Sequence, residues 1–551
     1  MAVPTRLCDD SPQGEIALAK IALHLALGLL AALLACSDAS DPAPDAGEVL
    51  PAAAAPADQD EPTADANGQS APAEVTRGLQ ASQPGVTEGY VLFSPLLSDT
   101  SYLVDNEGRV VHLWKTAYSP GGGQYLLPNG HLLRPGRDPE ALAFRAGGAG
   151  GYIQELDWQG DVVWEWRLSN ADQILHHDIE PMPGGHILAL AWETLERDEA
   201  LRLGRRGGTT SEAGLWPDWV VEIEPIRPKG ARVVWEWHAR DHFVQSEDPV
   251  RPDYGQPADH PDRIDLNGFS AAPPIDPDQL AQLQAIGYVP ADADPSADES
   301  RRDFLHINSV AYNEDLDQIA LSVPTFGEIW IIDHGTTTAE AAGSNGGRAG
   351  RGGDLIYRWG NPAAYGRGTP EEKRLFYQHD VRWIPAGAQG VGRLMIFNNG
   401  DGRQDGSYSS IDEIDPPLDA NGRYRLVDGA PFGPSELAAS YSERDRFFSP
   451  FISGAHRLPN GNTMICQGIS GRLFEIAPDG RVVWDYLVPY GGTVRNKDGS
   501  MPQPGLDDSP HAVFRATRIP ADHPGLKGRQ LVPLDPQPPV HVAKQGAEAD
   551  S

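Results

Sequence analysis

Three histidines of this chain stand at the same place in a recurring sequence pattern. His177, His306 and His379 each begin a short apolar segment that leads into a turn and a second apolar segment. Near neutral pH an imidazole can attack through a neutral ring nitrogen, or it can donate a proton. Histidine at one fixed place in separate repeats therefore indicates a site that does chemistry.

A single histidine in a strand is most often a packed core residue, and we favour that interpretation for His131 and His186. Three histidines at one register favour a functional site. Two chemistries stay open at this point. The imidazoles could act as nucleophile and acid, or the three together could hold a divalent metal with one open position.

The elements that carry these histidines are predicted to be strands. From Gly89 onward apolar and polar residues alternate, as in half-buried strands. Each unit adds a third strand and a fourth one, and the fourth strands are predicted at 162–166, 233–237, 355–359, 424–427 and 482–486. Four strands in each of several irregularly spaced units are typical of β-propeller blades.

The units number six, and they are predicted to open near Gly122, His177, His306, His379, Ser453 and His511. We expect the last unit to combine strands from both ends of the chain: 513–519 and 530–534 from the C-terminus, 102–105 and 110–114 from the N-terminus. Such a ring leaves no exposed sheet edge. The prediction is an all-β fold, a six-bladed β-propeller with four-stranded blades whose N- and C-terminal strands share the last blade.

In a propeller the first strand of each blade lines the central axis. His177, His306 and His379 lie on consecutive blades, so we expect them to converge at one end of that axis. The second strands return to the same face, where their ends carry Arg137, Trp192, Pro324 and Asn399.

Four blocks of the chain resemble those of the bacterial arylsulfotransferases, over about residues 89–526. The blocks are His177-Asp178-Ile179-Glu180-Pro181, His306-Ile307-Asn308-Ser309, Gln378-His379-Asp380 and Val513-Phe514-Arg515-Ala516. The resemblance implies a six-bladed propeller that moves a sulfuryl group from a phenolic sulfate to a phenol without PAPS. It also implies a transient sulfo-histidine, by position at His379, with His306 and His177 as the other catalytic histidines, and neither a metal nor a nucleotide cofactor.

One position departs from the family pattern. The arginine expected about eighteen residues after the second histidine is Pro324 here. An arginine there would bind sulfuryl oxygens with its fork of donors, and proline has none. Arg137 and Arg382 are candidate substitutes, and Asn399 is a third candidate for substrate binding. The alternative function is a propeller that binds a ligand without turnover.

Composition excludes some partners. The formal net charge of -34 argues against nucleic acid, because phosphate needs a basic surface. Of the three cysteines, Cys8 and Cys36 lie in the N-terminal region, which leaves Cys466 alone in the folded part. No internal disulfide is expected there, and Cys466 is interpreted as a small buried apolar residue.

The N-terminal region predicts export. Residues 21–35 form an apolar run after Lys20 that is short for a membrane span and fits a signal peptide. It ends Leu33-Leu34-Ala35-Cys36, which resembles a lipobox with Cys36 as the acylated residue. The alternatives are a plain signal peptide or an N-terminal anchor. We expect a periplasmic protein or an outer-membrane lipoprotein that touches the membrane only through that anchor.

The domain prediction follows from these segments. Residues 1–36 are the signal, and 37–86 are a flexible tether rich in Ala, Pro and Asp. Residues 87–540 form the propeller, and 541–551 are a disordered tail. Insertions near 193–217, 242–302 and 334–353 are either lids or solvated loops. The second insertion is predicted to hold a short helix from Pro277 to about Ile286.

Overall fold

The computed structural model describes residues 76–540, apart from residues 142, 269–276, 291–295, 297, 299–300 and 493–510. The predicted signal, the lipidation residue Cys36, most of the predicted tether and the tail 541–551 lie outside the described residues. None of the helices among the described residues is long and apolar enough to cross a membrane.

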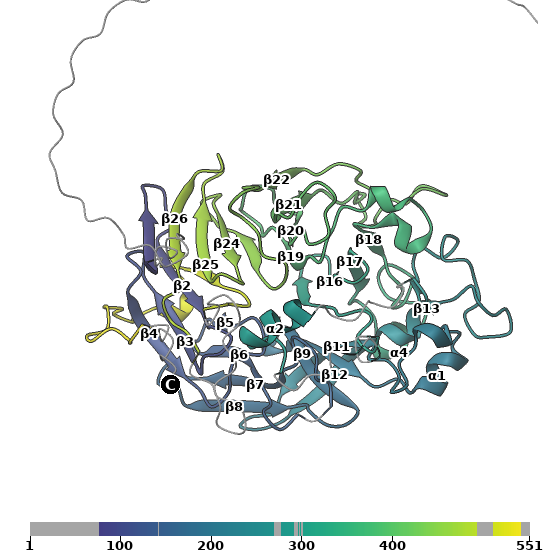
Figure 1. The fold of residues 1–551 in the computed structure, drawn as a ribbon, viewed down its shortest axis with the longest axis horizontal. Coiled ribbons are helices and arrows are strands. Elements are labelled where there is room, and N and C mark those ends of the chain that lie inside the picture. The colour runs from purple at the N-terminus through teal and green to yellow at the C-terminus, as the bar shows by residue number, and fades with distance from the viewer. Residues whose placement is uncertain are drawn as a thin grey trace, which may run out of the picture. The chain divides into compact units, whose positions relative to one another are not determined.

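Six antiparallel sheets surround a common axis, as Figure 1 shows, and they confirm the six-bladed propeller. Blades 1 to 3 are β5 (Tyr125–Leu126), β6 (Leu132–Arg137), β7 (Gly151–Leu156), β8 (Val162–Arg167); β9 (Gln173–Pro181), β10 (Ile187–Glu193), β11 (Asp218–Pro225), β12 (Ala231–His238); and β15 (Ser309–Asn313), β16 (Gln318–Val323), β17 (Glu328–Asp333), β18 (Tyr357–Trp359).

Blades 4 to 6 are β19 (His379–Trp383), β20 (Leu394–Asn398), β21 (Ser410–Ile414), β22 (Ala439–Tyr441); β23 (Gly454–Arg457), β24 (Thr463–Gln467), β25 (Arg472–Ile476), β26 (Val482–Leu487); and β27 (Thr517–Pro520), β2 (Gly89–Phe93), β3 (Thr100–Val104), β4 (Val110–Lys115). In each blade the first-named strand is the innermost. The insertions contain α1 (Arg197–Arg202), α2 (Pro277–Ala285), α4 (Thr338–Ala341) and a small parallel pair, β13 (Phe243–Val244) and β14 (Ile264–Asp265). The helix predicted from Pro277 is thus confirmed as α2.

The last blade closes the ring with one strand from the C-terminus and three from the N-terminus. The prediction of two strands from each end is therefore wrong, although the shared blade itself is confirmed. Strand β2 takes the second place, where it pairs with both β27 and β3. Residues 530–534 form no strand, and the Leu534 amide donates to the Val110 carbonyl at the outer strand instead. The buried apolar residues of β2 make it the better inner strand.

Two other strands differ from the prediction. β1 (Gly78–Ser82) lies inside the predicted tether, where it pairs with β26 as a fifth strand of blade 5. The fourth strand of blade 4 is β22, whereas the prediction placed it at 424–427. Tyr424 instead stacks on Tyr357 of blade 3, with ring centroids 4.6 Å apart, and its hydroxyl donates to Gln318. The segment 424–427, predicted as a strand, therefore packs over the junction between blades 3 and 4.

Tryptophans of the outer strands join neighbouring blades. In each case the indole is buried and its Nε1–H donates to a backbone carbonyl between the third and fourth strands of the neighbouring blade. The pairs are Trp114 with Asp157, Trp164 with Gly230, Trp237 with Gly353, Trp359 with Pro434, and Trp484 with Asn106. The recurring tryptophans of the sequence thus hold the blades side by side.

The closing strand should contribute measurably to stability. Ile519 of β27 is buried with Leu92, Leu103 and Trp114. We expect Ile519→Ala to lower the free energy of unfolding by about 2–5 kcal/mol, because it removes buried apolar surface and leaves a cavity. The exposed Val532 is the control, and Val532→Ala should change the value by less than about 0.5 kcal/mol. Equal effects in urea unfolding would show that β27 does not close the ring.

Candidate active site

The three histidines lie together at one end of the inner strands. His177 belongs to β9, His306 precedes β15, and His379 begins β19. The rings of His177 and His306 are 4.5 Å apart, centroid to centroid. The Phe514 ring lies between blades beside His177 and His379, at 6.2 and 6.4 Å. The geometry therefore matches the convergence expected from the register.

The backbone bends at the same place in several blades. His177 and His306 have φ of 49° and 54°, and Asp380, directly after His379, has φ of 51°. In blade 5 Ile452 and Ser453 have φ of 51° and 89°. Left-handed conformations of non-glycine residues cost about 1–3 kcal/mol each and gather at functional sites. The bend also shifts the strand register within β9 and β19.

His177 is buried and its two ring nitrogens each have a partner. Its Nδ1 lies 2.8 Å from Nδ1 of His176, and its Nε2 lies 2.8 Å from the Tyr288 hydroxyl. Gly148 leaves room for the ring, since a Cβ there would lie 2.1 Å from Nε2. Burial, together with the neighbouring His306 and His176, lowers the pKa of His177 well below its ordinary value, so the ring is neutral.

His306 is the most accessible of the three, with 21% of its side chain exposed. Its Nδ1 donates to the carboxylate of Asp303. A carboxylate on Nδ1 fixes the ring orientation and leaves Nε2 facing the other histidines. That Nε2 lies 3.5 Å from the Tyr288 hydroxyl.

His379 is held as a neutral imidazole with a defined tautomer. Its Nδ1–H donates to Oδ1 of Asn399 at 2.8 Å, which leaves the lone pair on Nε2. The Ile452 amide N–H donates to that lone pair at 3.2 Å. Asn399 donates in turn to the carbonyls of Ser449 and Ile452. Burial lowers the pKa of His379 to about 4, so Nε2 can act as a nucleophile over the neutral range.

The predicted binding residues have other partners. Arg137 donates to the backbone carbonyls of Gly287 and Tyr288 in the second insertion. Arg382 pairs with Asp380 at 2.7 Å and donates to the Tyr125 hydroxyl at 3.1 Å. Asn399 positions His379, as described above. Both arginines are thus bound to groups of the protein itself, and Pro324 is buried at the end of its blade.

The aspartates that follow two of the histidines bind one arginine at the axis. Arg515, just before β27, donates to both carboxylate oxygens of Asp178 at 2.9 and 3.0 Å. Its Nε lies 3.0 Å from Asp380. All three side chains are buried. This set, Arg515 with Asp178 and Asp380, is called the axial ion cluster below.

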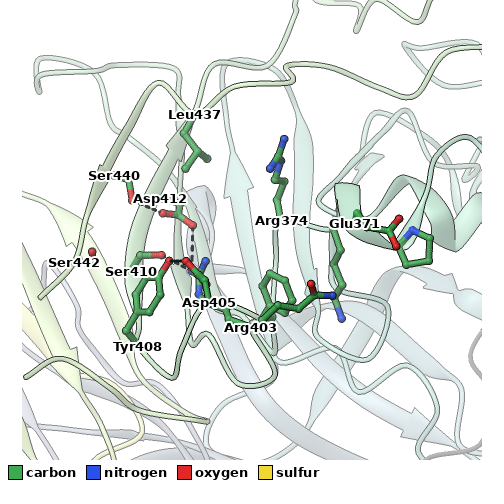
Figure 2. A pocket seen from close by; sticks show the side chains of 14 residues that line it. Glu371, Arg374, Arg403, Asp405, Tyr408, Ser410, Asp412, Leu437, Ser440 and Ser442 are labelled. Atoms are coloured by element: carbon green, nitrogen blue, oxygen red, sulfur yellow. Dashed lines mark hydrogen bonds and ion pairs between the residues drawn. The ribbon is translucent and has the colours of Figure 1, made fainter. Parts of the chain in front are cut away.

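Further pockets lie away from the histidines. A pocket of about 460 Å³ lies at the outer part of blade 4, where Figure 2 shows Tyr408 close to Ser410 and Asp412. Arg374 and Arg403 also line it. Arg403 donates to the Ser410 hydroxyl at 2.7 Å. A pocket of about 320 Å³ is lined by Tyr125, Glu180 and Arg382, among others. None of His177, His306 and His379 lines either pocket, so we place the candidate site at the histidines.

The geometry does not favour the three-histidine metal site. In the part of the chain that the structure describes, no group of three or more His, Cys, Asp or Glu side chains is arranged to hold a metal ion. The Nε2 atoms of His177 and His306 both face the Tyr288 hydroxyl, and that of His379 faces the Ile452 amide.

Several residues of the site were not found from the sequence. They are His176, Asp218, Tyr288, Asp303 and Ile452. Asp303 stands three residues before His306, which is a weak signal for a partner of its ring. Tyr288 lies in an insertion with no repeat to compare, and the amide of Ile452 carries no side-chain signal at all.

The hydrogen bond from His379 to Asn399 makes a testable prediction. In Asn399→Asp a carboxylate would face Nδ1–H, and the pKa of His379 should rise from about 4 by about one unit or more. NMR titration of the ring in protein labelled with ¹⁵N-histidine measures this. Asn361→Asp, on a loop of blade 3, is the control and should leave the His379 titration unchanged. An unchanged pKa in Asn399→Asp would contradict the assigned tautomer.

Comparison with solved structures finds distant likenesses. A protein of unknown function from Bacteroides caccae is 9% identical, with TM-score 0.39, and the match covers 79% of this chain and 99% of that one. A streptogramin B lyase is 10% identical, with TM-score 0.32 and coverage of 76% and 92%. The WD40 domain of Toxoplasma gondii coronin is 11% identical, with TM-score 0.30 and coverage of 74% and 78%.

Comparison of the sequence with known proteins identifies the family. No curated protein matches the chain. The family model for arylsulfotransferase (ASST) matches residues 96–483, which is well over half of the chain and spans all three histidines. The chain therefore belongs to the arylsulfotransferase (ASST) family.

Proposed function

We propose that this chain is an exported aryl-sulfate sulfotransferase that moves a sulfuryl group from a phenolic sulfate ester to a phenol through a sulfo-histidine at His379. Aryl sulfotransferase activity is the activity of the family. The observation that carries the finer proposal is the neutral His379 ring, with Nδ1–H bound to Asn399 and Nε2 unprotonated among two further histidines.

The first step transfers the sulfuryl group to the protein. Nε2 of His379 attacks sulfur, an S–N bond forms, and the bond between sulfur and the phenolic oxygen breaks. The electron pair of that bond leaves with the phenolate. The phenolate then takes a proton from a donor in the cluster around His177 and His306. General acid catalysis of this kind contributes about 10²–10⁴-fold.

The second step reverses the first with another phenol. The acceptor phenol loses its proton toward the same two histidines, and its oxygen attacks sulfur. The S–N bond breaks, and the electron pair returns to Nε2 of His379. Such an exchange follows ping-pong kinetics, since the first phenol leaves before the second reacts.

The sulfuryl oxygens need donors in a site that lacks the family arginine. The Ile452 amide donates to Nε2 of His379 at 3.2 Å. That hydrogen bond breaks when Nε2 attacks sulfur, and the released N–H can then bind an oxygen of the transferred group. Pro324 in place of arginine still favours one alternative, a propeller that binds aryl sulfates without turnover.

The partners and the location belong to the same proposal. The donor and the acceptor would be small phenolic molecules, in agreement with the substrates of the family. The apolar run 21–35 and Cys36 support export and a lipid anchor on sequence grounds alone.

A sulfuryl adduct on His379 is the direct test. Purified protein that begins at Ser37 is mixed with 4-nitrophenyl sulfate in the absence of PAPS, and the peptide that contains His379 is analysed by mass spectrometry. We expect the adduct, and we expect release of nitrophenolate that accelerates when phenol is added. His379→Gln should lose both, by at least about 10³-fold.

The matched control is His456→Gln. His456 is an inner-strand histidine of blade 5 whose Nε2 accepts from the Arg518 amide, outside the histidine cluster. Its variant should keep adduct formation within about threefold of the unmodified protein. Turnover that survives His379→Gln would rule out the covalent route, and binding of aryl sulfates without adduct or release would establish the non-catalytic propeller.

The acid limit of the first step follows from the pKa of His379. Protonation of Nε2 removes the nucleophilic lone pair, and burial places that protonation at about pH 4. The single-turnover rate of adduct formation from 4-nitrophenyl sulfate should therefore stay level from about pH 8 to about pH 5.5. A rate that already halves near about pH 6.5, the ordinary pKa of histidine, would contradict the buried neutral nucleophile.

A further inference from the structure

Tyr288 reaches the histidine cluster from the second insertion. It follows α2, which lies near the centre of the ring of blades in Figure 1. Only 5% of Tyr288 is exposed. Its hydroxyl lies 2.8 Å from Nε2 of His177 and 3.5 Å from Nε2 of His306. A phenol group of the protein thus stands inside the proposed site for phenols.

The surroundings hold this tyrosine in place. Arg137 donates to its carbonyl and to that of Gly287. Its ring stacks on Phe451 with centroids 6.0 Å apart. Gly147 leaves the space for the ring, because a Cβ there would lie 2.3 Å from it. A partly buried arginine, an aromatic partner and a glycine therefore hold the Tyr288 side chain in place.

A row of polar groups extends from the hydroxyl into the blade. His177 Nδ1 lies 2.8 Å from Nδ1 of His176, and Nε2 of His176 lies 3.2 Å from Oδ1 of Asp218. Both histidines and Asp218 are buried. The row from the surface of the site inward is Tyr288, His177, His176 and Asp218.

The protonation states suit a relay without charged histidines. Burial raises the pKa of Asp218 well above its usual range and lowers the pKa of both histidines well below theirs. Burial likewise raises the pKa of Tyr288, so its hydroxyl keeps its proton. Among the described residues, His176 Nε2 and Asp218 Oδ2 are buried without a hydrogen-bond partner, so a protonated Asp218 that turns its hydroxyl toward Nε2 can donate to His176. His176 can then donate to His177, and His177 to the oxygen of Tyr288.

We propose that Tyr288 is a further catalytic residue, the end of a proton relay that delivers the proton of Asp218 to the leaving phenolate and recovers it from the acceptor phenol. The inference rests on the proposed function and names the acid–base group of that site. The insertion would thus supply a proton donor. The family arginine, replaced here by Pro324, would instead bind sulfuryl oxygens.

The proton balance closes over the two steps. When the S–O bond breaks, the phenolate takes the Tyr288 proton, Tyr288 takes one from Nε2 of His177, and His177 takes one at Nδ1 from His176. His176 takes the proton of Asp218, which becomes a carboxylate. The acceptor phenol reverses each transfer as its oxygen attacks sulfur, and Asp218 is protonated again.

The test varies the leaving group in Tyr288→Phe, which keeps the ring and removes the hydroxyl. A nitrophenolate leaves without a proton, whereas a 4-methylphenolate needs one. We expect Tyr288→Phe to lower the single-turnover rate about 100-fold with 4-methylphenyl sulfate and less than about fivefold with 4-nitrophenyl sulfate. Tyr424→Phe, whose hydroxyl donates to Gln318 between blades 3 and 4, is the control and should change neither rate.

Other outcomes overturn the proposal. Equal losses with both donors would show a structural role, because a distorted site slows every substrate alike. Unchanged or faster rates would show that Tyr288 only occupies the place of a substrate phenol.

A second measurement does not depend on turnover. The hydrogen bond from Tyr288 predicts that Tyr288→Phe shifts the ¹⁵Nε2 resonance of His177, assigned with His177→Gln. An unchanged resonance overturns the relay even if no sulfuryl transfer is found. A shifted resonance in a protein that forms no adduct would retain the hydrogen-bonded row and reject the proposed function alone.

Discussion

The axial ion cluster is the interaction on which the rest of the structure depends. Arg515 comes from blade 6, Asp178 from blade 2 and Asp380 from blade 4. The carboxylates also accept backbone N–H groups of two more blades, from Val310 and Ala455. Five of the six blades thus meet at three buried side chains. Removing one partner of such a cluster would leave an uncompensated buried charge, which costs about 3–5 kcal/mol.

The cluster also explains where the histidines point. Asp178 and Asp380 directly follow His177 and His379, so a pair of neighbouring residues serves two purposes. The aspartate binds Arg515 at the axis, and the left-handed backbone bend turns the histidine toward the site. The strain of that bend persists because the ion pairs and the bond from Asn399 to Ile452 hold both sides of it. The position of the His177 and His379 rings is therefore set by the buried ion pairs beside them.

The part of this structure that repeats was predictable, and the part that occurs once was not. The Val-Val-Trp strands and the histidine register predicted six blades and the convergence of His177, His306 and His379, because each copy supports the others. Strand β2 was missed because it stands alone beside the tether. Arg382 was expected to bind substrate, and the structure adds an ion pair with Asp380, two residues earlier in the same strand.

Features of the site that occur only once were not predicted, because no other repeat supports them. Tyr288 depends on an insertion that only tertiary packing brings to the axis, and the amide of Ile452 is visible only as backbone geometry. Local periodicity reports which face of a strand is buried, but it does not report which loop covers the end of the ring. The histidine cluster could be predicted from sequence. The groups that bind its ring nitrogens, the Tyr288 hydroxyl and the Ile452 amide, could be found only from the coordinates.

The central claim is that sulfuryl transfer passes through His379 in two displacements, and the stereochemistry at sulfur tests it most directly. A phenyl sulfate ester made chiral with ¹⁶O, ¹⁷O and ¹⁸O is supplied with a phenol acceptor, and the configuration of the product ester is determined. Each displacement inverts the configuration, so the two-step route predicts overall retention. Overall inversion would show one direct transfer between the phenols and would contradict the sulfo-histidine at His379.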